Sequence, residues 1–159
     1  MALVITSIWA NAANATTIST AAVAKLECKN YSKMAEVDVT AKGVSVSVPY
    51  YKGQFCIDFH RTSTRVDSLR YEFGSLFHRT CEWWVNFDFW DGLTGEQYYH
   101  WEAGQQRHFG CSRWGSGTRN VANDPNVPPL RSGQVCGTLY TGYQKNAILL
   151  TTVCKYVAV

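Results

Sequence analysis

The sequence predicts an all-β protein, a small disulfide-stapled antiparallel β-barrel or β-sandwich of eight to ten short strands with little helix. Three observations lead to this prediction. Apolar and polar residues alternate along most of the chain, which is typical of half-buried strands. Six widely spaced cysteines predict a disulfide framework. The 159 residues, 46% of them hydrophobic and 17% charged, suit a single domain 1–159 with a core of its own.

The expected elements can be placed in chain order. Residues 2–8, 34–41 and 44–51 are the first three strands, and Lys42 and Gly43 between the last two predict a hairpin turn. The later strands are expected at residues 54–60, 65–73, 81–90, 97–102, 135–140 and 147–157. Residues 20–27 are the one helical candidate, although their pattern fits a strand nearly as well.

The cysteine spacing contains no C-x-x-C, which excludes the usual zinc-finger and thioredoxin motifs. Fifteen connectivities are open to six cysteines. Facing residues of a hairpin have a constant index sum, and the three neighbouring cysteine pairs are centred on Lys42, Glu96 and Lys145, each at or beside a predicted turn. We therefore favour the pairs Cys28–Cys56, Cys81–Cys111 and Cys136–Cys154.

The same cysteines predict a secreted, extracellular protein, which we expect to be a monomer. The sequons that begin at Asn14 and Asn30 are compatible with secretion. No apolar run reaches the roughly 20 residues that a membrane-spanning helix needs, so no membrane span is expected. Residues 3–10 are apolar but follow no basic residue, so we interpret the N-terminus as the start of a mature domain.

One segment, residues 112–133, lacks periodicity and holds three of the four prolines, so we expect a long irregular loop there. Residues 107–131 carry four arginines against one aspartate, which accounts for the net charge of +3. The preferred contact residues are Arg113, Trp114, Arg119 and Arg131, because arginine beside tryptophan is common in interfaces. A solvated loop without a role is the alternative. Nucleic acid is not expected, since no Lys/Arg run occurs.

Aromatic residues gather between residues 83 and 101. Trp83, Phe87 and Phe89 alternate on the face expected to fill the core, while Trp84 and Trp90 point the other way. If this face is exposed, the tryptophan row would suit binding. If a second sheet or loop covers the face, the same residues are part of a buried layer, and both interpretations are open. A carbohydrate-binding module or lectin that uses Trp84, Trp90 and Trp101 is therefore the alternative function.

Catalytic signals are weak, so we expect no enzyme, no metal and no cofactor. His100, Glu102 and His108 could together hold a metal, but such co-occurrence is common. A third class, an enzyme, would use the carboxylates Asp88, Asp91, Glu96 and Glu102, which ordinary solvated hairpins also carry. Residues 99–102 are distantly similar to the Tyr-x-His strand of fungal ribonucleases, but no histidine follows position 108 to complete that set.

In its size, six cysteines and β-rich pattern, the whole chain resembles the secreted necrotrophic effectors, or host-selective toxins, of the wheat nodorum-blotch fungus. The resemblance is one of architecture and carries over no binding residues. It implies a disulfide-bonded β-barrel released from a precursor and active outside the fungus. It also implies a host plant protein as partner, a receptor or defence protein, whose recognition leads to cell death. A virulence effector or toxin that acts by binding is thus the predicted function.

Overall fold

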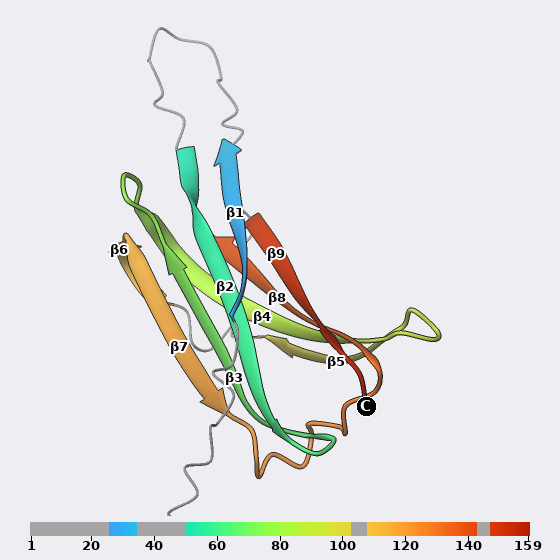
Figure 1. Ribbon diagram of the computed structural model, residues 1–159. Coiled ribbons are helices and arrows are strands. Elements are labelled where there is room, and N and C mark those ends of the chain that lie inside the picture. The colour runs from blue at the N-terminus through green and yellow to red at the C-terminus, as the bar shows by residue number, and fades with distance from the viewer. Residues whose placement is uncertain (1–25, 35–49, 103–107, 143–146) are drawn as a thin grey trace, which may run out of the picture.

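The computed structural model describes residues 26–34, 50–102, 108–142 and 147–159, which contain nine strands and no helix (Figure 1). The strands are β1 (Glu27–Met34), β2 (Tyr50–Thr62), β3 (Arg65–Gly74), β4 (Thr80–Asp91), β5 (Gln97–Glu102), β6 (His108–Ser112), β7 (Trp114–Asn120), β8 (Gly133–Thr141) and β9 (Ile148–Val157). Every pairing between them is antiparallel. No described helix is long and apolar enough to cross a bilayer.

The strands form two sheets that pack face to face. The first has the order β1-β2-β3-β7, and the second has the order β5-β4-β8-β9, with β6 also paired to β4 (Figure 1). The sheets do not close into a barrel, so of the two expected architectures the structure shows the sandwich. Alternate residues of each strand point inward, as the period-two pattern predicts.

The core lies between the sheets. Phe55 and Leu69 of the first sheet and Phe87, Phe89 and Leu139 of the second are fully buried there. Burying one side chain of this size contributes about 1.5–3 kcal/mol relative to leaving it exposed. The expected core role of Trp83, Phe87 and Phe89 is confirmed.

Six of the expected strands are confirmed within a few residues, as β2, β3, β4, β5, β8 and β9. The expected strand at residues 2–8, the turn at Lys42 and Gly43, and most of the strands around that turn lie outside the described residues. The helical candidate 20–27 is described only at its end, where Glu27 begins β1.

The disulfide prediction is confirmed for all three pairs. Cys28 bonds Cys56, Cys81 bonds Cys111 and Cys136 bonds Cys154. In each pair the two cysteines face each other on neighbouring antiparallel strands. In β8–β9 the hairpin register fixes which residues can be bridged without moving the backbone, whereas β4 and β6 are not consecutive strands and a register shift lies between Cys81 and Trp83.

The expectation of an irregular loop over residues 112–133 is wrong in its first part, where Trp114–Asn120 form β7. The inward positions of β7 include Gly115 and Gly117, so the strand has no apolar alternation. A Cβ atom at Gly115 would come within 2.3 Å of Phe73 and 2.5 Å of Trp83. The core rings of β3 and β4 thus fill the space that side chains of β7 would need, and the strand signal disappears from the sequence.

Candidate functional site

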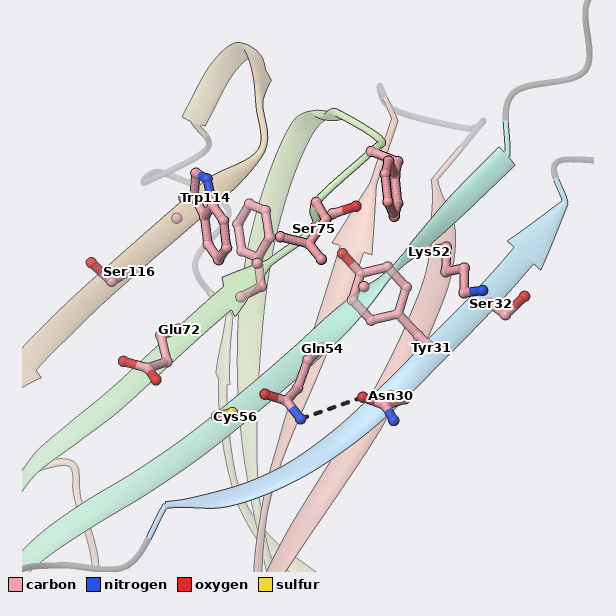
Figure 2. Close-up of a pocket in the computed structure, with 16 residues that line it drawn as sticks. Asn30, Tyr31, Ser32, Lys52, Gln54, Cys56, Glu72, Ser75, Trp114 and Ser116 are labelled. Carbon is pink, nitrogen blue, oxygen red and sulfur yellow. Dashed lines mark hydrogen bonds between the residues drawn. The ribbon is translucent and has the colours of Figure 1, made fainter.

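A groove of about 920 Å³ lies on the outer face of the first sheet (Figure 2). Its side chains come from all four strands of that sheet and from the β3–β4 connection. The lining residues are Asn30, Tyr31, Ser32, Lys52, Gly53, Gln54, Cys56, Glu72, Phe73, Gly74, Ser75, Leu76, Phe77, Trp114, Gly115 and Ser116. We call it the sheet groove.

One cross-strand row runs through the sheet groove. The register places Trp114 of β7 opposite Gly74 of β3, Gly74 opposite Gln54 of β2, and Gln54 opposite Asn30 of β1. The indole of Trp114 covers Gly74, because a Cβ there would lie 2.1 Å from Cζ3 of the ring. At the other end of the row, Gln54 Nε2 donates a hydrogen bond to Asn30 Oδ1 (3.3 Å) (Figure 2).

The neighbouring positions of the sheet groove are polar. Ser116 of β7 faces Glu72 of β3, and Glu72 faces Cys56 of β2. Glu72 also accepts a hydrogen bond from Arg70 (3.3 Å) at the surface. On the other side of the row, Lys52 adds one positive charge. The groove thus combines one exposed indole with amides, hydroxyls and charges of both signs.

Bulky exposed side chains border one end of the sheet groove. Leu76, Phe77 and Trp114 are 69%, 77% and 62% exposed, and Arg113 is also exposed. The two segments that carry them are held together by a backbone hydrogen bond from Ser75 N–H to the Arg113 carbonyl (2.9 Å). We call Leu76, Phe77 and Trp114, with the charged Arg113 beside them, the apolar rim.

The four predicted contact residues do not share one surface role. Arg113 and Trp114 lie at the apolar rim. Arg119 points inward and is held by Asp124 (2.9 Å) and by the face of Trp101, 4.5 Å from the ring centroid. It therefore fastens β7 to the second sheet.

Arg131 lies beside the β4–β5 hairpin. It pairs with Asp91 (3.2 Å) and covers the ring of Tyr98 at 4.8 Å from its centroid. Backbone N–H groups of Leu93 and Thr94, together with Arg131, hold the pKa of Asp91 below its ordinary value. The Asp91 carboxylate therefore stabilises the β4–β5 turn. This structural role differs from the catalytic role considered from the sequence.

The expected tryptophan row does not form. Trp84 is 4% exposed and stacks on Tyr140, with ring centroids 5.2 Å apart, and Trp101 is 7% exposed. Trp90 is 37% exposed. Of the two explanations considered for Trp84, the covered face is the one observed, because the side chain is buried; its assignment as a binding residue stays a prediction. The carbohydrate-binding alternative loses the platform on which it relied.

The histidines considered for a metal site lie on opposite faces of β4. His100 Nδ1 contacts Asp88 Oδ1 (2.5 Å) on the outer face, whereas His108 stacks on the core residue Trp83 with centroids 3.7 Å apart. Desolvation lowers the pKa of His108. Among the described residues no cluster of three or more His, Cys, Asp or Glu side chains could hold a metal.

The sequence did not single out Asn30, Gln54, Glu72, Leu76 or Phe77 as site residues. They lie on three different strands and in the β3–β4 connection, and no motif links them in the sequence. Only the strand register brings them together. Comparison of the chain with protein-family models, curated proteins and solved structures finds no match. The function must therefore be argued from the sheet groove and the apolar rim.

Proposed function

We propose that the protein acts outside the cell that makes it, as an effector of the host-selective toxin class. It binds a host plant protein, and recognition of the complex leads to cell death. It works by binding rather than by catalysis. Three cross-strand disulfides support secretion, because such bonds persist in oxidising compartments.

The apolar rim is the observation that carries this proposal. Exposed tryptophan, phenylalanine and arginine side chains on one rigid edge are the residue types that dominate binding energy in protein interfaces. Soluble monomers rarely expose such groups together without a partner. The rim is also positioned firmly, since Trp114 belongs to β7 and the backbone hydrogen bond between Ser75 and Arg113 fixes the β3–β4 connection.

Leaf infiltration tests the proposal. The oxidised protein is infiltrated across a panel of plant lines, beside a reduced and alkylated sample. We expect necrosis in some lines only, and its loss on reduction. The variant Leu76→Ser/Phe77→Ser should abolish necrosis without altering the melting temperature. Leu93→Ser is the matched control, because Leu93 is 95% exposed in the β4–β5 hairpin. No response in any line, or full activity of the rim variant, would refute the proposal.

A further inference from the structure

We propose that the sheet groove binds a neutral oligosaccharide, with Trp114 as the stacking platform and Gln54, Asn30 and Glu72 as hydrogen-bonding partners. This site differs from the tryptophan row considered from the sequence. It shares Trp114 with the apolar rim of the host-protein proposal, but its hydrogen-bonding groups on β1, β2 and β3 lie outside that rim.

The platform is the first argument. A Cβ at Gly74 would lie 2.1 Å and 2.3 Å from Cζ3 and Cε3 of Trp114, so this edge of the indole rests against the Gly74 backbone. The ring is nevertheless 62% exposed, which leaves the side away from the sheet to solvent. A flat aromatic face of this kind packs against the C–H face of a sugar ring, and it buries a large area at little entropic cost.

The polar groups are the second argument. The hydrogen bond between Gln54 and Asn30 uses one hydrogen of Nε2 and one lone pair of Oδ1. Each amide has two donor hydrogens and an acceptor oxygen with two lone pairs, so both side chains can also bind hydroxyl groups. Figure 2 shows Trp114, Gln54 and Asn30 on three different strands of the sheet, with Glu72 beside the row. Three strand spacings of about 4.8 Å make the row about 14 Å wide, which suits several linked sugar rings.

The backbone argues against an extended peptide as the occupant. The sheet groove lies across the face of the sheet, over the central strands β2 and β3, whose main-chain groups are paired on both sides. A peptide that adds to a sheet requires a free strand edge. An apolar protein surface would also strip water from Gln54, Asn30 and Glu72 without replacing their hydrogen bonds, which is costly. A polyhydroxylated ligand replaces those bonds.

The charges favour a neutral sugar. The lining carries one carboxylate, Glu72, and one ammonium, Lys52, and Glu72 also pairs with Arg70 (3.3 Å), which is not a lining residue. A polyuronate would bring carboxylates close to Glu72, and like charges at that distance repel. Polygalacturonate is therefore the matched negative probe.

The experiment is calorimetric titration of the oxidised protein with cellohexaose, xylohexaose, mannohexaose and chitohexaose. The protein is produced in a bacterial periplasm, so that the sequon at Asn30 carries no glycan. We expect saturable binding of at least one hexasaccharide and none of polygalacturonate. Trp114→Ala and Gln54→Ala should each weaken binding at least tenfold, while Trp90→Ala, which removes an exposed tryptophan of the other sheet, should not.

Gly74→Ala provides a test that keeps the tryptophan. The added methyl must displace the Trp114 ring, and the ring can move because it is the exposed end of a side chain. Binding should therefore fall at least tenfold with little change in melting temperature. Absence of binding by all four hexasaccharides, or binding that Trp114→Ala leaves intact, would overturn the proposal. Gln54→Ala leaves the apolar rim unchanged, so it should lose sugar binding but keep necrosis, which separates the two proposals.

Discussion

Replacing Gly115 by alanine tests how β7 is packed. The new methyl would meet Phe73 Cε1 at 2.3 Å and Trp83 Cζ2 at 2.5 Å, both well inside van der Waals contact. Phe73 and Trp83 are 3% and 4% exposed and form an edge-to-face pair with centroids 4.7 Å apart, so neither ring can withdraw freely.

The expected magnitude follows from two opposing effects. Overpacking a dense core costs about 1–3 kcal/mol. Alanine also makes the unfolded chain less flexible than glycine does, which stabilises the folded protein by about 0.4–1 kcal/mol. We therefore expect Gly115→Ala to lower the free energy of unfolding by about 1–2 kcal/mol, or the melting temperature by about 2–8 °C for a chain of this size.

Urea denaturation with the disulfides intact measures this change. Ser116→Ala is the control, because Ser116 is exposed on the opposite face of the same strand, and it should change stability by less than about 0.5 kcal/mol. Phe73→Leu in the Gly115→Ala background should recover part of the loss, since it removes ring atoms that the methyl meets. A Gly115→Ala protein as stable as the wild type would refute the packing argument.

Three further predictions concern stability. Replacing the Cys136–Cys154 pair by serines opens a loop with a sequence separation of 18 and should cost about 3 kcal/mol in urea denaturation; a change below 1 kcal/mol would contradict the loop-entropy account. The pKa of His108 is lowered by desolvation, so the unfolded chain takes up this proton first and stability falls as the pH drops below about 6.5. His108→Phe should flatten that part of the profile, and identical profiles would exclude the effect. Arg119→Met should lower the free energy of unfolding by about 1 kcal/mol, whereas Arg113→Met should leave it unchanged, and equal thermal shifts would contradict the assigned roles.

Most strands were predictable because their inward residues are large and apolar. In β4, for example, Trp83, Val85, Phe87 and Phe89 alternate without a gap. The disulfides were predictable for a related reason, since antiparallel pairing ties each cysteine to one facing position. Both arguments use only short-range periodicity and local turns, which a single sequence displays directly.

The strand β7 and the sheet groove were not predictable by those means. The inward positions of β7 hold Gly115 and Gly117, whose small size is explained only by rings on β3 and β4. The row through the groove joins Asn30, Gln54, Gly74 and Trp114, which lie far apart in the chain. Its existence depends on the registers of β1 with β2 and of β2 with β3, and on the pairing of β3 with β7 across the intervening residues 75–113.

The exposure of Trp114 was predicted for an incomplete reason. Its place beside Arg113 in a segment without periodicity suggested an exposed contact. In the structure its exposure follows from its outward position on β7, and its orientation follows from the glycine opposite it on β3. Any side chain larger than hydrogen at position 74 would displace the ring. The chemistry available at Trp114 is therefore a property of the Gly74–Trp114 pair, so variants at position 74 test the groove more selectively than removal of the tryptophan.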